Sequence, residues 1–176
     1  MADGGDQGPG AGGTALAEEM FAADRASAGL GMRLEQVGDG TAVVSMTVLP
    51  SMVNGHRIGH GGYVFMLADS AFACACNSRG AVTVAAGADI SFIAQVREGD
   101  VLVATAAERI SFGRNGIYDV TVRRGDEIVA EFRGRSRAVG RRRAGADLAA
   151  ADPGALADVH RPGAGRRDLG EPPQPR

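Results

Sequence analysis

The stretch at residues 60–80, HGGYVFMLADSAFACACNSRG, decides how this chain folds. From residue 63 to residue 76 every side chain is apolar or small except those of Asp69 and Ser70. The apolar segment is too long for a single strand, and because it is apolar nearly all round it predicts a buried central helix that stops at Gly80. It is also too short for a membrane span, which needs about 20 apolar residues, and it contains an acid.

The segments on either side of this helix predict the rest of the fold. Residues 15–30, ALAEEMFAADRASAGL, have the apolar spacing of one amphipathic helix. Six runs have strand character: MRLEQV and TAVVSMTVL before the central helix, then VTVAAGADISFIA, VLVATAAERISF, GIYDVTV and EIVAEFRGRSRAV after it. The links GDG, GRNG and RRGD are hairpin signals, so the sheet should be antiparallel. Gly87, inside the third run, predicts a bulge or bend.

Together these elements predict an α+β fold in which a curved antiparallel sheet of about six strands wraps around one long central helix. This is the layout of the hotdog fold. We expect one folded domain over residues 14–140. Residues 1–13, rich in Gly and Asp, and the Arg-, Gly- and Pro-rich tail at residues 141–176 should be disordered.

Composition excludes several classes of function. The net charge of -2 gives no reason to expect a nucleic-acid partner. All 19 basic residues are Arg, so lysine Schiff-base chemistry and a P-loop lysine are ruled out. The first residues have neither a basic start nor an apolar core, so no signal peptide and no membrane association are expected, and we predict a cytoplasmic protein.

The cysteines and histidines do not form a metal-site pattern. Cys74 and Cys76 lie two positions apart, so on a helix they point to different faces, and they should be small buried hydrophobes in a reducing compartment. His56 and His60 are four apart, but they lie in a glycine-containing loop and lack the HExxH pattern. We expect no metal.

Gly61 and Gly62 stand where the central helix should begin, with His60 at its N-cap. The first N–H groups of a helix have no internal partners and carry partial positive charge. Glycine allows a ligand oxygen to approach those groups closely, as a polarised carbonyl or an oxyanion requires. The alternative is that both glycines only make a tight turn from loop to helix.

Asp69 is the only charged residue on the central helix, and an ionised carboxylate away from water is costly unless it is paired. It is either a solvated residue or, because this helix lacks a polar face, a group that faces a cavity or an interface. Partial desolvation would raise its pKa and suit it to act as a base or nucleophile. Gly61 lies eight residues away, which is about 12 Å along a helix, so the two can cooperate only from different chains. This predicts a homodimer with two shared sites.

The string at residues 52–80, MVNGHRIGHGGYVFMLADSAFACACNSRG, with AVVSMTV before it and FRGRSRAVG after it, resembles the PaaI family of hotdog acyl-CoA thioesterases over about residues 20–140. The resemblance implies that Asp69 is the catalytic nucleophile or the base for water. It implies that the Gly61 N–H polarises the thioester carbonyl and that Asn54 holds substrate or water. His60 should line the site near the thioester, and we expect Gly62 to bind the substrate as well.

The resemblance also implies a reaction and an assembly. The family hydrolyses phenylacetyl-CoA and its ring-hydroxylated relatives, needs no metal or organic cofactor, and forms dimers that pair into tetramers. Where family members commonly have Arg-Pro, this chain has Ala94-Gln95, so a contact with the coenzyme A phosphates is in question there, and Arg97 or Arg114 could replace it. Two other interpretations stay open: a hotdog hydratase or dehydratase, and a non-catalytic acyl-CoA-binding module.

Overall fold

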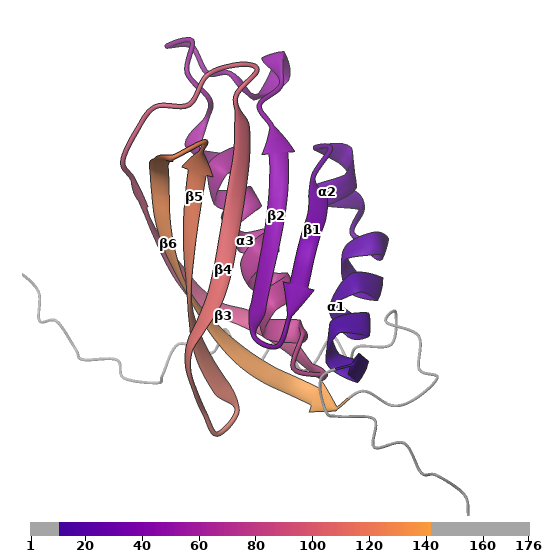
Figure 1. Ribbon diagram of the computed structural model, residues 1–176. Coiled ribbons are helices and arrows are strands. Elements are labelled where there is room, and N and C mark those ends of the chain that lie inside the picture. The colour runs from indigo at the N-terminus through magenta and orange to yellow at the C-terminus, as the bar shows by residue number, and fades with distance from the viewer. Residues whose placement is uncertain (1–10, 142–176) are drawn as a thin grey trace, which may run out of the picture.

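The computed structural model describes residues 11–141, which form two layers, a curved sheet and the helices on its concave side, joined by loops (Figure 1). The elements in chain order are α1 (Ala11–Ala23), α2 (Arg25–Gly29), β1 (Arg33–Gly38), β2 (Thr41–Thr47), the short 3-10 helix η1 (Pro50–Met52), α3 (Gly61–Asn77), β3 (Ala81–Phe92), β4 (Val101–Phe112), β5 (Asn115–Arg124) and β6 (Glu127–Arg141).

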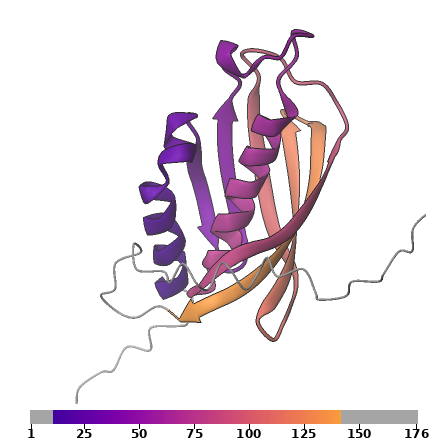
Figure 2. The ribbon, with the colours of Figure 1, turned by 180° about the vertical axis from the view of Figure 1, so that it is seen from behind.

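The sheet has six strands in the order β1-β2-β4-β5-β6-β3, and every neighbouring pair is antiparallel. It curves around α3, which runs across its concave face, while α1 packs beside α3 (Figure 2). The predicted α+β hotdog architecture is therefore confirmed. Among the described strands β3 pairs only with β6, so within residues 11–141 its outer edge has no neighbouring strand.

The central helix α3 spans 17 residues and begins at the predicted position. Its interior face is closed by apolar packing, with Leu67, Ala68 and Phe72 at most 1% exposed. The N–H of Ser78 continues the helical bonding to the Cys74 carbonyl, and Gly80 then takes a positive φ of 79°. A residue with a Cβ disfavours that conformation, so glycine ends the helix as expected.

The three predicted hairpins form at the expected places. Gly40, Gly113 and Gly125 have φ angles of 75°, 59° and 56°, and each supplies the left-handed conformation that a tight antiparallel turn needs. The pairing of β3 with β6 shifts register between Ala85 and Gly87, which is the irregularity predicted at Gly87.

Two expectations for the N-terminal region were wrong. The single helix predicted over residues 15–30 is broken at Asp24, whose Oδ1 accepts hydrogen bonds from the N–H groups of Ala26 and Ser27 and so caps a second helix. Residues 11–13, expected to be disordered, belong to α1, and Arg141, the first residue of the tail expected to be disordered, ends β6. The rest of the segments expected to be disordered, residues 1–10 and 142–176, lie outside the described residues.

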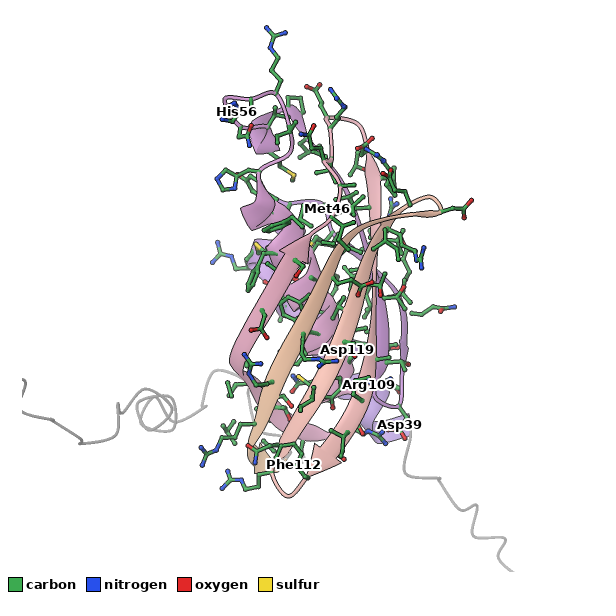
Figure 3. The ribbon with its side chains drawn as sticks, turned by 90° about the vertical axis from the view of Figure 1, so that its left-hand side faces the viewer. Asp39, Met46, His56, Arg109, Phe112 and Asp119 are labelled. Carbon is green, nitrogen blue, oxygen red and sulfur yellow. The ribbon has the colours of Figure 1, made fainter. Side chains whose placement is uncertain are left out.

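The convex face of the sheet is polar. Arg133 on β6 donates two hydrogen bonds to Asp119 on β5, at 2.7 Å and 2.9 Å, and Arg109 on β4 lies 3.3 Å from the same carboxylate (Figure 3). Charged side chains that pair across neighbouring strands in this way can remain exposed to water. Large exposed apolar side chains occur both on β4, at Val101, Ile110 and Phe112, and at the end of β3, at Phe92 and Ile93.

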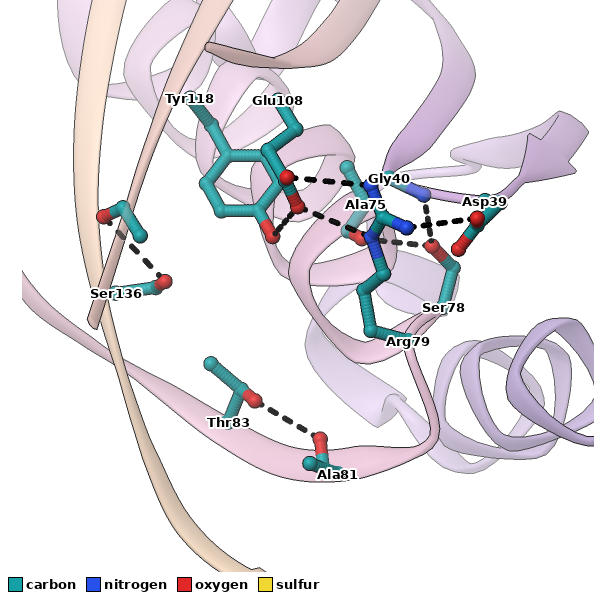
Figure 4. A network of polar contacts seen from close by, with 11 residues as sticks. Asp39, Gly40, Ala75, Ser78, Arg79, Ala81, Thr83, Glu108, Tyr118 and Ser136 are labelled. Atoms are coloured by element: carbon teal, nitrogen blue, oxygen red, sulfur yellow. Dashed lines mark hydrogen bonds and ion pairs between the residues drawn. The ribbon is translucent and has the colours of Figure 1, made fainter. Parts of the chain in front are cut away.

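A polar network ties the C-terminal end of α3 to the sheet (Figure 4). Arg79 donates two hydrogen bonds to Glu108, each 3.1 Å long, and one of 2.7 Å to Asp39. The Tyr118 hydroxyl donates to Glu108 at 2.9 Å, and Ser78 Oγ accepts from the Gly40 N–H at 2.8 Å. This end of the helix is thus held by the turn between β1 and β2 and, through Glu108, by β4, while Tyr118 on β5 supports Glu108. Among the helices of residues 11–141, none is long and apolar enough to cross a membrane.

We expect Gly134→Ala to lower the free energy of unfolding by about 1–3 kcal/mol, because a Cβ there would lie 2.7 Å from two ring atoms of buried Phe72. Gly140→Ala, on the same strand with no atom within 4 Å of the added carbon, is the matched control. Urea unfolding of both variants measures the difference. Equal stabilities would contradict this account of the packing between α3 and β6.

Candidate active site

The first turn of α3 leaves one backbone donor unused. The His60 N–H donates to the Met52 carbonyl at 2.8 Å, and the N–H groups of Gly62 and Tyr63 donate to the Nδ1 and the carbonyl of His60, both at 3.0 Å. Within residues 11–141 the Gly61 N–H has no acceptor. A helix N-terminus with one free N–H is suited to bind a carbonyl or oxyanion oxygen.

His60 takes the predicted N-cap position, with extended backbone at φ -67° and ψ 128°. Its ring packs edge-on against Tyr63, with 6.3 Å between the ring centroids. Because Nδ1 accepts the hydrogen bond from Gly62, Nε2 is the ring nitrogen that remains to donate. His60 therefore has a structural role in starting α3, and its side chain is exposed.

Asn54 organises the loop that leads to the helix. Its Oδ1 accepts from the His56 N–H at 2.8 Å, and its own N–H donates to the Ile58 carbonyl at 2.8 Å. Arg57, between these contacts, has a positive φ of 61°. In the described chain the side-chain amide nitrogen of Asn54 has no acceptor, so it is available to donate to a ligand.

A groove of about 380 Å³ brings Asn54 and Gly61 together. It is lined by Asn54, Ile58, Gly59, Gly61, Val64, Phe92, Ile93, Ala94, Gln95, Val96 and Val129. His60 and Gly62 adjoin Gly61 but do not line the groove. The walls are largely apolar and the polar groups few, which is the usual construction of a site for a small organic ligand.

Asp69 lies on a partly exposed stripe of α3 formed by Gly62, Met66, Asp69 and Ala73. Its side chain is half-buried, and it has no hydrogen bond or ion pair within residues 11–141. Burial raises its pKa above the ordinary value for aspartate, because the charged form loses hydration. A carboxylate in this state is a stronger base than a solvated one.

Asp69 and Gly61 do not meet within one chain. Both belong to the continuous helix α3, so about 12 Å of helix separates them, as expected from their spacing. A single chain therefore holds the two groups apart. The Gly61 N–H lies with Asn54 in the groove, and the unpaired Asp69 carboxylate lies two helical turns away.

Sequence reasoning missed the groove residues Phe92, Ile93 and Val96. Phe92 and Ile93 are 56% and 59% exposed, unusual for large apolar side chains, and they follow one another at the end of an edge strand. A strand pattern identifies such residues as strand, but it does not indicate that they turn toward a helix N-terminus.

The two arginines considered for coenzyme A lie at opposite ends of β4. Arg97 is in the loop before β4, next to the groove residue Val96, and its backbone N–H donates to Asp100 at 2.8 Å. Arg114 is in the turn after β4 and donates to the Ala138 carbonyl at 2.9 Å. Only Arg97 is at the same end of the molecule as the groove.

A second cavity, of about 260 Å³, lies beside the network of Figure 4 and is bordered by Cys76, Arg79 and Tyr118 among others. Neither Asp69 nor Gly61 borders it. Within residues 11–141 no cluster of three or more His, Cys, Asp or Glu side chains could hold a metal ion.

Comparison with known proteins finds similarity to thioesterases. Residues 56–131 match the family model of the thioesterase superfamily. The chain is 42% identical over 125 residues to the acyl-coenzyme A thioesterase PaaI of Escherichia coli, a match that covers 70% of this chain and 89% of that protein.

Solved structures agree with this match. The structure of E. coli PaaI, from the phenylacetic acid degradation operon, aligns with a TM-score of 0.73 and 38% identity over 76% of this chain and 98% of that one. A hypothetical thioesterase from Streptococcus pneumoniae, solved with coenzyme A, aligns with a TM-score of 0.66 and 25% identity over 71% of this chain and 98% of that one.

Proposed function

The chain belongs to the PaaI family of hotdog thioesterases, and from this membership we propose that it hydrolyses phenylacetyl-CoA or ring-hydroxylated phenylacetyl-CoA to the free acid and coenzyme A. The relative in E. coli is an acyl-coenzyme A thioesterase, and the one in S. pneumoniae was solved with coenzyme A. The observation that carries the proposal is the unused Gly61 N–H at the start of α3, which opens into an apolar groove beside Asn54.

The proposed reaction uses groups from two chains. The Gly61 N–H donates to the thioester carbonyl oxygen and stabilises the negative charge that develops there. Asp69 of the partner subunit either attacks the carbonyl carbon, which expels the coenzyme A thiolate and leaves a mixed anhydride for water to cleave, or removes a proton from an attacking water. In both routes one water is consumed, and the products are the acid and the thiol.

Two features support a homodimer built on α3 and β3. Residues 11–141 leave the stripe of Gly62, Met66, Asp69 and Ala73 on α3 partly exposed, together with Phe65 beside it, and this face is small or apolar except for Asp69. Within the part of the chain that the structure describes, the outer edge of the twelve-residue strand β3 is unpaired, and a long unpaired edge readily takes a second strand. A two-fold axis would then place each Asp69 near the other helix's N-terminus.

Further parts of the proposal rest on the family alone. We propose that two such dimers form a tetramer, that no metal or organic cofactor takes part, and that Asn54 and His60 contact the substrate beside Gly61. Acyl-CoA chemistry and the two free buried thiols agree with a cytoplasmic enzyme.

Release of free thiol from a panel of acyl-CoA thioesters tests this function. We expect phenylacetyl-CoA and its hydroxylated forms to be hydrolysed with kcat/KM of about 10⁴ M⁻¹s⁻¹ or more, and acetyl-CoA to be a poorer substrate. A metal chelator should leave the rate unchanged. Binding of phenylacetyl-CoA without thiol release would identify an acyl-CoA-binding module instead.

A further inference from the structure

The ring of Phe92 lies directly against Gly61. Phe92 is the last residue of β3, and its side chain is 56% exposed although it is large and apolar. A Cβ added to Gly61 would be 2.8 Å from Cζ of this ring and 3.2 Å and 3.3 Å from its two Cε atoms. The far edge of the ring therefore covers the residue that carries the unused N–H.

The backbone fixes the ring in this place. Phe92 pairs with Ala130 on β6, and the N–H groups of Ile93 and Ala94 both donate to the Val129 carbonyl, at 2.9 Å and 3.2 Å. These bonds to β6 fix the end of β3 beside the start of α3. The position of β3 in the sheet therefore places the Phe92 side chain in the groove. Packing within residues 11–141 does not account for an aromatic residue there, since more than half of the side chain is exposed in the single chain.

We propose that Phe92 is a further determinant of catalysis, which screens the Gly61 N–H from water on one side while the thioester carbonyl occupies it. The proposal rests on the thioesterase function proposed above. A hydrogen bond to developing charge is worth more where water is excluded and the local dielectric is low. In the groove, Phe92 is the aromatic side chain placed to exclude that water. Two reasons then require glycine at position 61. A side chain would hinder the approach of the substrate to the N–H, and its Cβ would clash with the Phe92 ring.

A double-mutant cycle tests the proposal on the full-length protein. We expect Phe92→Ala to lower kcat for phenylacetyl-CoA about tenfold with little change in KM, because the lost screening acts on the transition state more than on binding. Phe92→Leu, which keeps apolar bulk, should recover part of the loss. Gly61→Ala should also lower kcat, because its Cβ displaces the ring, yet Gly61→Ala should cost little in the Phe92→Ala background.

Controls separate this role from a structural one. Phe112→Ala removes a similarly exposed aromatic side chain, 52% exposed, at the opposite end of the molecule from His56 (Figure 3), and should leave kcat unchanged. Oligomeric mass and melting temperature should be the same for Phe92→Leu and the wild type.

Three results would overturn the proposal: an unchanged kcat in Phe92→Ala, a change confined to KM, or losses that multiply in the double variant. An inactive wild type is a different result, which would remove the proposed function and this inference with it.

Discussion

Asp69→Asn is expected to reduce kcat/KM for phenylacetyl-CoA by about 10³-fold or more, because asparagine can neither attack the thioester nor accept a proton from water. The substitution keeps the size and shape of the side chain. Thiol release measured under single-turnover and steady-state conditions gives the loss. Asp126→Asn, in the turn between β5 and β6, changes an exposed carboxylate in the same way and should leave the activity unchanged.

The stability of Asp69→Asn shows whether the acid is kept for function or for folding. The pKa of Asp69 is raised in the folded chain by burial, so the ionised form costs folding free energy at pH values above that raised pKa. The cost disappears as the pH falls and the group is protonated. At neutral pH the variant should therefore unfold at the same or a higher denaturant concentration than the wild type. A marked loss of stability would mean that Asp69 has an attractive partner and is structural.

Mixing two inactive variants is expected to restore activity if each site is shared between chains. Gly61→Pro removes the N–H of Gly61 at the first helical position, where proline is tolerated, and the extended backbone of His60 is compatible with a following proline. Neither Gly61→Pro nor Asp69→Asn should hydrolyse phenylacetyl-CoA by itself. A mixed dimer contains one site with an intact Asp69 from one chain and an intact Gly61 from the other.

Unfolding and refolding an equal mixture should make half of the dimers mixed, each with one working site of two. The expected activity is about one quarter of the wild-type value, starting from two nearly inactive proteins. Refolding each variant alone is the control. If the mixture stays as inactive as its components, the site is contained in one chain and the shared-site mechanism is wrong.

Much of the fold was predictable because its signals are local. The length and apolarity of residues 61–77 require a buried helix, and the glycines at 40, 113 and 125 favour tight turns wherever the strands on either side end. The break at Asp24 was missed because the apolar spacing continues through it. A side chain that caps a new helix competes locally with helix continuation, and periodicity does not detect that competition.

Some residues of the candidate site could likewise be identified from the sequence, and others could not. Gly61 and Asp69 were identified from the sequence, since a glycine at a helix start and a lone acid on an apolar helix are unusual in themselves, and their separation follows from the rise of a helix. Their roles in catalysis remain predictions. Phe92 was not identified, because its contact with Gly61 joins residues 31 positions apart.

By itself, the sequence determined the central helix, the antiparallel hairpins and the impossibility of joining Asp69 to Gly61 within one chain, because each depends on local conformation or helix geometry. The tertiary structure alone decided that the Gly61 N–H is the unused donor of its turn, that Asn54 shares its groove, and that the Phe92 ring lies against Gly61. These facts depend on where the end of β3 meets the start of α3. The register of β3 on β6 and the curvature of the sheet determine where these two ends lie. Both depend on contacts between residues far apart in the sequence.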